Sequence, residues 1–389
     1  MLTTRVAIIG GGLSGLYAAA LLEQRGIKDY LLLEARDTFG GRILSMPADS
    51  AAGRYDLGAT WFWPALNPDL AALIEVLGLE TFAQFEAGDM LVEHSRSTAP
   101  TRVNGYRSAS PALRVAGGMA ALTNAIRDRL KPECIISGHR VRGLRHLGDG
   151  IEIQAHDALG STIRHRVAHV LLAVPPRLAA TTIAFSPILP EETIRPWLHC
   201  GTWMAPHAKY VAVFDAPFWR EQGLSGETRS AVGPLAEIHD ASAHRGGAAL
   251  FGFLGVPAQV RSKTPEAVLL AHCRAQLVRL FGDRAGAPRA EFLKDWTSDP
   301  CTAVLADRHP GPHHDATLPS TASTGVWRDR LIGIASEWSP RFPGYVAGAL
   351  EAAHLGVALL HAPDQTLQSR FRIEENWRCR NRRPTKRCR

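Results

Sequence analysis

The feature that most constrains this chain is the run GGGLSG at residues 10–15, close to its beginning. A glycine-rich run alone is weak evidence, because such turns are common. Here the apolar run 6–9 predicts a buried strand before it, and the Ala/Leu-rich run 16–22 predicts a helix after it. A strand, a glycine turn and a helix in this order predict a unit that binds a dinucleotide.

The glycines and the next acid have separate tasks in such a unit. Gly10 permits the tight turn, Gly12 lets a pyrophosphate approach the backbone, and Gly15 lets the helix pack close to the strand. The N–H groups and the positive dipole end of the helix favour the pyrophosphate. Glu34, after a second predicted strand at 30–33, would accept hydrogen bonds from ribose hydroxyls and repel a 2′-phosphate. This arrangement predicts FAD or NAD(H) rather than NADP(H).

The segment after Glu34 favours FAD over NAD(H). Residues 36–42 read R-x-x-x-G-G-R, in which Gly40 and Gly41 let the backbone pass close to a ligand. Arg42 offers a fork-shaped donor for phosphate oxygens.

Further motifs follow in a fixed order along the chain. They are EAR at 34–36, GGR at 40–42, DLGA at 56–59, GGM at 117–119, LLAVPP at 171–176, PFW at 217–219, SE at 336–337 and GY at 344–345. In this order they resemble the FAD-dependent amine oxidases, the monoamine and polyamine oxidase group. The resemblance runs from about residue 5 to residue 361, so it covers nearly the whole chain.

The resemblance implies an α/β fold with two domains. One is a Rossmann-type FAD-binding domain with a parallel sheet that is discontinuous in sequence, and the other is an inserted α+β substrate-binding domain. On this chain the FAD-binding segments would be 1–62, 112–184 and 300–361, and the substrate-binding segments 63–111 and 185–299. The residues implied to contact FAD are Gly10, Gly12, Ser14, Gly15, Glu34, Arg36, Gly40, Gly41, Arg42, Gly58, Ala59, Thr60, Val141, Glu337, Tyr345 and Val346.

Lys209 is the first candidate catalytic residue. It opens an otherwise apolar strand predicted at 209–214, whose alternation suggests one covered face. The matching family position holds a lysine that reaches toward flavin N5 through a water. A buried lysine has a lowered pKa and can serve in proton transfer or oxygen activation. The alternative is a lysine at a strand end that extends to water.

Tyr345 is the second candidate, at the start of a helix predicted over 344–360. The resemblance implies that it forms one wall of an aromatic cage over the flavin, where an electron-rich ring face suits an amine. The start of the helix would direct N–H donors at the flavin pyrimidine and stabilise the reduced, anionic ring. The alternative is an ordinary core tyrosine.

The chain departs from the family around residue 305. Ala306 stands where the second cage aromatic would be, and Leu305 stands where some members carry a cysteine that binds flavin covalently. Cys301 lies too early for that linkage. We therefore expect non-covalent FAD and a wider pocket on this side.

Four aromatic residues are predicted to line the substrate pocket: Trp61, Trp63, Trp338 and Phe342. Trp61 stands where related L-amino-acid oxidases tend to carry an arginine for the substrate carboxylate. This difference favours an amine without an α-carboxylate. Simple core packing is the alternative for all four residues.

Charge and cysteine spacing limit the partners. Residues 370–389 hold nine Arg or Lys and two Glu, so they account for the whole net charge of +7. We expect residues 362–389 to be a disordered basic tail, and the neutral remainder gives no reason to expect a nucleic-acid partner.

The six cysteines show no C-x-x-C or metal spacing, which is typical of reduced thiols in a cytoplasmic protein. We expect no metal, signal peptide or membrane anchor, and a homodimer is compatible with the sequence.

The predicted function is oxidation of a primary or secondary amine to an imine, which hydrolyses to an aldehyde or ketone while dioxygen becomes hydrogen peroxide. Two alternatives stay open. One is an FAD-dependent desaturase or protoporphyrinogen-type oxidase that acts on a large apolar substrate. The other is a non-catalytic flavoprotein that is recruited through its basic tail.

Overall fold

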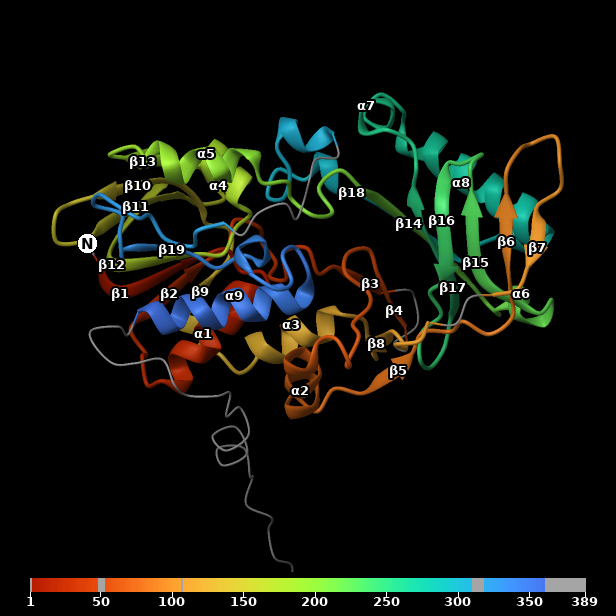
Figure 1. Cartoon of the computed structure of the whole chain (residues 1–389), viewed down its shortest axis with the longest axis horizontal. Helices are drawn as coiled ribbons and strands as arrows, with labels where there is room; N and C mark the ends of the chain where they lie inside the picture. The colour runs from red at the N-terminus through yellow and green to blue at the C-terminus, as the bar shows by residue number, and fades with distance from the viewer. Residues whose placement is uncertain (1, 48–52, 106–107, 310–317, 361–389) are drawn as a thin grey trace, which may run out of the picture.

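Two β-sheets lie side by side along the length of the molecule (Figure 1). The computed structural model describes residues 2–47, 53–105, 108–309 and 318–360. The predicted tail 362–389 lies outside the described residues. Among the described residues, one sheet has eight strands and the other has seven, and two further sheets have two short strands each.

The eight-stranded sheet contains the dinucleotide-binding unit. Its order is β13-β10-β11-β12-β1-β2-β9, with β19 beside β12. Strands β12, β1, β2, β9 and β19 pair in parallel, whereas β10, β11 and β12 form an antiparallel meander. The bounds are β1 (Leu2–Ile9), β2 (Tyr30–Leu33), β9 (Ile135–Ile136), β10 (Arg140–His146), β11 (Ile151–His156), β12 (Thr162–Leu172), β13 (Ala184–Ser186) and β19 (Leu331–Gly333).

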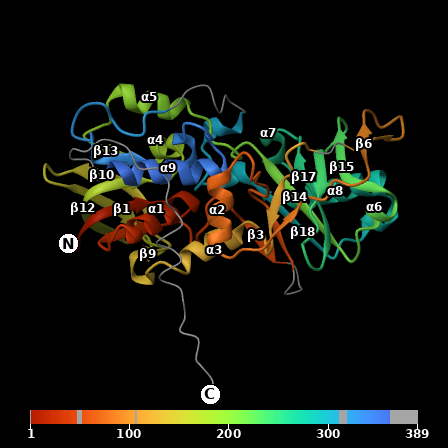
Figure 2. The same cartoon turned by 60° about the horizontal axis from the view of Figure 1, so that its bottom comes forward.

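Helices cover both faces of this sheet (Figures 1 and 2). Val6 and Ile8 of β1 face one core, and Ala7 and Ile9 face the other, as expected for a buried parallel strand. On the first face lie α1 (Leu13–Gln24), α2 (Pro68–Val76), α3 (Ala120–Arg127) and α9 (Val346–Leu359). On the second face lie α4 (Pro176–Thr182) and α5 (Glu191–His199).

The seven-stranded sheet is largely antiparallel, in the order β18-β14-β17-β16-β15-β6-β7. Helix α8 (Glu266–Phe281) packs on one face, and the pair β3 (Ser45–Pro47) and β4 (Arg54–Asp56) reaches the other. Its strands are β6 (Asp89–Glu93), β7 (Thr101–Val103), β14 (Ala208–Phe214), β15 (Leu224–Ser230), β16 (Leu235–Asp240), β17 (Ala248–Leu254) and β18 (Ala290–Asp295).

Short elements complete the described chain. A second strand pair is β5 (Thr81–Ala83) with β8 (Leu113–Val115), and two short helices are α6 (Phe218–Glu221) and α7 (Ala258–Arg261). The 3₁₀ turns are η1 (Pro132–Cys134), η2 (Asp283–Gly286), η3 (Trp296–Ser298), η4 (Leu305–Arg308) and η5 (Ser336–Trp338).

Strand β14 differs from its predicted pattern. The sequence suggested one covered face, but all seven residues are buried. Tyr210 and Ala212 pack under α8, whereas Val211 and Val213 pack against the β3–β4 side. Lys209 is therefore enclosed on the second side rather than facing water.

Two helices from the predicted substrate-binding segments, α2 and α5, pack on the eight-stranded sheet. Leu70, Leu73 and Ile74 of α2 join one core, and Trp197 of α5 joins the other, because each helix has an apolar side that this sheet can bury. The assignment of cofactor and substrate roles to the two parts stays a prediction.

The packing of α5 makes a prediction about stability. Trp197 is 1% exposed and meets the Trp338 ring edge-on at 5.2 Å. Trp197→Ala leaves a large cavity there and should lower the free energy of unfolding by about 3–5 kcal/mol. Urea unfolding followed by circular dichroism measures this change. The half-exposed neighbour Leu198 is the control, since Leu198→Ala should shift unfolding little; equal shifts for both variants would contradict the packing described.

Candidate active site

A cavity of about 910 Å³ lies at the carboxyl ends of the parallel strands. Gly10 follows β1, Glu34 follows β2 and Ala173 follows β12, and all three line it. The seven-stranded sheet contributes Glu237 and Phe253. Ligands of open α/β sheets bind outside the carboxyl ends of the strands, so this cavity is the candidate active site.

The glycine turn forms a close-packed cradle at one end. A Cβ at Gly15 would lie 1.9 Å from the carbonyl oxygen of Gly10, and a Cβ at Gly10 would lie 2.7 Å from that of Ala173. Gly12 precedes α1 and forms a bridge with Gly40. A side chain at these positions would fill the space at the start of the helix. Because the residues are glycines, the backbone N–H groups remain accessible to an anionic ligand.

Glu34 lies in this cradle and is almost fully buried. Its two carboxylate oxygens accept hydrogen bonds from the backbone N–H groups of Gly11 (2.6 Å) and Arg36 (2.8 Å). The Arg36 guanidinium is in turn bound by Asp299 (2.8 Å) and Thr302 (3.0 Å). The carboxylate is thereby fixed at the cavity wall, as its predicted ribose-binding role requires.

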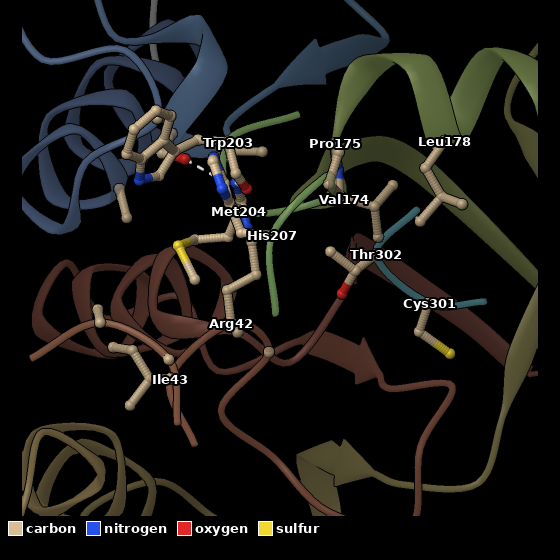
Figure 3. A pocket seen from close by; sticks show the side chains of 18 of the residues that line it. Arg42, Ile43, Val174, Pro175, Leu178, Trp203, Met204, His207, Cys301 and Thr302 are labelled. Atoms are coloured by element: carbon tan, nitrogen blue, oxygen red, sulfur yellow. Dashed lines mark hydrogen bonds between the residues drawn. The ribbon is translucent and has the colours of Figure 1, made fainter. Parts of the chain in front are cut away.

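Arg42 uses its donors differently from the sequence prediction. Its two terminal nitrogens donate to the two carboxylate oxygens of Glu337, at 2.6 and 2.9 Å. They also donate to Ser336 Oγ (3.0 Å) and to the carbonyl oxygen of Trp203 (3.2 Å). Figure 3 shows the Arg42 side chain extending toward Met204 and Trp203. The fork predicted for phosphate is thus engaged within the protein, although Arg42 still lines the cavity.

Lys209 lies directly behind the cavity wall. Its ammonium donates to Thr60 Oγ1 (2.5 Å) and to the Gly58 carbonyl (3.2 Å), and it sits 3.9 Å from the centre of the Phe251 ring. Gly58 and Thr60 line the cavity, whereas Lys209 itself does not. At 1% exposure it does not extend to water, which rules out that alternative.

The surroundings of Lys209 bring its titration near neutrality. Burial lowers the pKa of its ammonium to about 7, while the nearby Asp56 carboxylate raises this pKa and Arg114 lowers it. Asp56 is itself buried, and it accepts hydrogen bonds from Ser45 Oγ (2.5 Å) and the Met119 N–H (2.9 Å). Neither Asp56 nor Arg114 was predicted as a site residue. Asp56 belongs to the DLGA motif at 56–59, and Arg114 shows only a charge flanked by apolar residues.

Tyr345 stands at the aromatic end of the cavity. It immediately precedes α9, and its side chain is 48% exposed, so it is not a core tyrosine. Its ring stacks near-parallel on Trp203, with centroids 6.3 Å apart and planes at 24°. Trp203 was not predicted from the sequence. Ala306, the expected cage position, is solvent-exposed and outside the cavity lining.

The four aromatic residues predicted for the substrate pocket lie in two different places, and a substrate-binding role for Trp61 and Trp63 stays a prediction. Trp61 and Trp63 line the cavity, but Trp338 and Phe342 do not. Trp338 is buried beside Trp197, and its indole N–H donates to the Pro319 carbonyl (3.2 Å). Phe342 packs on the core under α9. The prediction was wrong for Trp338 and Phe342, because both rings pack in or against the hydrophobic core.

The remaining predicted cofactor contacts divide in the same way. Gly15 lies under the glycine turn and Glu337 behind Arg42, so neither lines the cavity. The others do line it, and they are Gly10, Gly12, Ser14, Glu34, Arg36, Gly40, Gly41, Arg42, Gly58, Ala59, Thr60, Val141, Tyr345 and Val346.

Two features are absent from the residues that the structure describes. No group of three or more His, Cys, Asp or Glu side chains among them could hold a metal ion. Within the same residues, no helix has the length and apolar character needed to cross a membrane.

The fold and the cavity define an α/β flavoprotein, and comparison with known proteins gives the family. The model of the family "Flavin containing amine oxidoreductase" matches residues 82–360, and that of the "NAD(P)-binding Rossmann-like domain" matches residues 8–77. The chain therefore belongs to the flavin-containing amine oxidoreductases. It is an FAD-dependent amine oxidase, and neither of the two alternative functions is favoured.

The chain is similar to curated relatives over nearly its full length. It is 26% identical to a probable flavin-containing monoamine oxidase A of Dictyostelium discoideum, covering 89% of this chain and 95% of the relative. It is 24% identical to a putrescine oxidase of Kocuria rosea, covering 91% and 94%.

Solved structures share the fold. A putrescine oxidase bound to putrescine matches with a TM-score of 0.75 and 21% identity, covering 92% of this chain and 98% of that chain. Cyclohexylamine oxidase from Brevibacterium oxydans IH-35A matches with a TM-score of 0.76 and 17% identity, with the same coverage.

The cofactor is FAD, and its non-covalent attachment stays a prediction. The residues present fit it, because the glycine cradle excludes side chains where a pyrophosphate would lie and Glu34 is fixed beside it. Leu305, at the position of the linking cysteine, is 73% exposed and outside the cavity lining.

The glycine cradle can be tested directly. Gly15→Ala places a Cβ against the Gly10 carbonyl, so the turn must open and the purified protein should lose most of its bound FAD. The ratio of flavin absorbance to protein absorbance measures this loss. Gly26→Asn is the matched control, since Gly26 has φ +77°, no atom near its Cβ position, and a conformation that Asn tolerates. Full FAD content in Gly15→Ala would contradict the cradle.

The titration of Lys209 predicts a pH dependence of stability. Above pH 7 the folded chain has lost the proton that the unfolded chain keeps up to about pH 10.4, so stability should rise with pH. Between pH 7 and 9 the gain from this group is about 2 kcal/mol. Lys209→Met should lack it. Urea unfolding of both proteins at pH 7, 8 and 9 provides the measurement, and parallel curves would contradict a low pKa for Lys209.

Proposed function

We propose that this amine oxidase converts a primary or secondary amine to an imine and passes the electrons to dioxygen. The observation that carries the proposal is one cavity that is lined both by the glycine cradle with Glu34 and by the half-exposed ring of Tyr345. Buried Lys209 stands behind the cavity wall, at Gly58 and Thr60.

The reaction balances with dioxygen as the acceptor. The amine loses two electrons and two protons, one from the α-carbon and one from nitrogen, and becomes an imine. Water adds to the imine and releases an aldehyde or ketone with ammonia or the smaller amine. Dioxygen takes up the two electrons and two protons as hydrogen peroxide. FAD, when bound, supplies the redox step by accepting the electron pair and handing it on.

The side chains of this site have supporting roles in that reaction. Lys209, with a pKa of about 7, can hold or release a proton next to Thr60 Oγ1. The face of Tyr345 attracts the amino group, because an aromatic face carries negative charge density. Trp61 presents an indole whose N–H is bound by Gln84 (2.8 Å), so this position offers no cation to a substrate carboxylate.

Relatives and neighbours narrow the candidate substrates to two shapes. Their names include a putrescine oxidase and a cyclohexylamine oxidase, which suggest a linear diamine and an alicyclic monoamine. We include both in the proposed substrate range.

A cytoplasmic location and a homodimer also belong to this proposal. The described cysteines are free thiols, which is compatible with a reducing compartment.

Oxygen use is tested by stoichiometry. The FAD-loaded full chain should consume one dioxygen and release one hydrogen peroxide for each amine oxidised, with an oxygen electrode and a peroxidase assay as readouts. Turnover only with an artificial acceptor would contradict the oxidase proposal.

A chain truncated before residue 370 should turn over at the same rate, whereas a module recruited by its tail would lose binding to its partner.

The proposed role of Lys209 predicts a selective loss of rate. Lys209→Met should lower kcat for oxygen-dependent turnover by about 100-fold, as expected when a positioned proton-transfer group is removed. Amine affinity should change by less than about twofold, because Lys209 lies behind the wall. Lys263→Met, at an exposed lysine after α7, is the control. An unchanged kcat in Lys209→Met would contradict the role.

A further inference from the structure

Lys209 is separated from the cavity by a wall that the segment 56–60 forms. Thr60 lines the cavity, whereas Lys209 does not. The lysine is 1% exposed, and the rings of Phe251 and Phe253 lie 3.9 and 5.6 Å from its Nζ. A proton that moves between this ammonium and the cavity must therefore pass through a group of the wall.

The structure gives the ammonium of Lys209 two hydrogen-bond partners in this wall, and only one of them can relay a proton. The Gly58 carbonyl accepts at 3.2 Å but has no proton to donate. Thr60 Oγ1 accepts at 2.5 Å and also carries a hydroxyl proton. The hydroxyl donates to the Gly58 carbonyl over 3.3 Å, which is a long hydrogen bond. It can therefore exchange this bond for one to an acceptor in the cavity.

The segment that carries Thr60 is held in place before any ligand binds. The Asp56 carboxylate accepts from the Met119 N–H at 2.9 Å, and the Leu57 carbonyl accepts from the indole N–H of Trp296 at 3.0 Å. Thr60 itself is only 6% exposed. A proton relay needs its groups at hydrogen-bond distance, and this packing keeps Thr60 Oγ1 next to the lysine.

The charges that face Lys209 leave it titratable near neutral pH. Burial dominates its pKa, which the Asp56 carboxylate of β4 raises and the Arg114 guanidinium of β8 lowers. The cross-strand neighbour on β18 is Lys294, whose ammonium is paired with Asp299 at 2.7 Å. Lys209 can therefore give up a proton and regain it under the same conditions.

We infer that the Thr60 hydroxyl is a proton relay that connects Lys209 Nζ to the cavity. This inference rests on the proposed function. During reduction of dioxygen, a proton of Nζ moves to Thr60 Oγ1, while the hydroxyl proton of Thr60 moves to the reduced oxygen in the cavity. An N–H bond of Lys209 breaks, the hydroxyl of Thr60 is re-formed, and Lys209 is left neutral.

The proton balance closes over one turnover. Hydrogen peroxide forms from dioxygen with two protons and the two electrons that FAD supplies when bound. The amine releases two protons and two electrons when it becomes an imine. The relay delivers one of the two protons, and neutral Lys209 regains it through Thr60 when the next amine is oxidised.

Reoxidation of the FAD-loaded full chain by dioxygen tests the relay. Reduction with one equivalent of dithionite avoids the amine, and stopped-flow absorbance records the return of the flavin band. Thr60→Val keeps nearly the same shape without the hydroxyl and should slow reoxidation about 100-fold. Thr60→Ser keeps the hydroxyl and should stay within threefold of the unmodified chain. Thr60→Ala, which also lacks the hydroxyl, replaces Thr60→Val if that variant does not bind FAD.

A matched control and a double variant sharpen this test. Thr228→Val, at a fully buried threonine of β15, should leave the rate unchanged. Thr60→Val combined with Lys209→Met should be no slower than Lys209→Met alone, because both substitutions interrupt the same path. A double variant whose loss equals the product of the two single losses would overturn the inference. So would reoxidation of Thr60→Val within threefold of the unmodified chain.

The pH dependence of stability provides a readout without turnover. Thr60→Val removes an acceptor that stabilises the ammonium, so the pKa of Lys209 should fall. The rise in the free energy of unfolding should then start at about pH 6 instead of about pH 7, and Thr60→Ser should restore it. An unchanged onset in Thr60→Val would overturn the relay alone. An unmodified chain that dioxygen does not reoxidise would overturn the proposed function as well.

Discussion

The ion pair between Arg42 and Glu337 is the interaction on which the site depends. It joins a segment near the start of the chain to the turn before α9, far apart in sequence, through two short hydrogen bonds. Glu337 is almost fully buried, so loss of either partner would leave an uncompensated charge, at a cost of about 3–5 kcal/mol. The same guanidinium donates to the carbonyl of Trp203, so one ion pair joins the segment of Arg42, the turn before α9 and the turn that carries Trp203.

The second sheet contributes a buried lysine to the site. Lys209 is the second residue of a strand whose residues are all buried, and its ammonium donates to Gly58 and Thr60 at the cavity wall. Burial lowers the pKa of Lys209 to about 7, although the Asp56 carboxylate raises it, so the side chain gains or loses its proton near neutral pH. Strand β14 of the seven-stranded sheet therefore places a titratable lysine behind the wall of the cavity whose glycine cradle belongs to the eight-stranded sheet.

The sequence predicted what depends on local pattern. The glycine turn, α1 and the burial of β1 follow from spacing and apolar runs, and the structure confirms them. Ribose binding by Glu34 stays a prediction. Trp203 escaped prediction because its direction depends on the φ of Met204 and on Arg42, and neither leaves a periodic signal. Trp338 was misplaced for the converse reason: the core packing that buried it comes from α5, distant in sequence.

Anaerobic titration of the FAD-loaded chain with amines tests the central claim most directly. The account predicts that putrescine or cyclohexylamine bleaches the flavin absorbance band completely, and that air restores the band with release of hydrogen peroxide. The account would be contradicted if no amine bleached a fully loaded flavin while dithionite did.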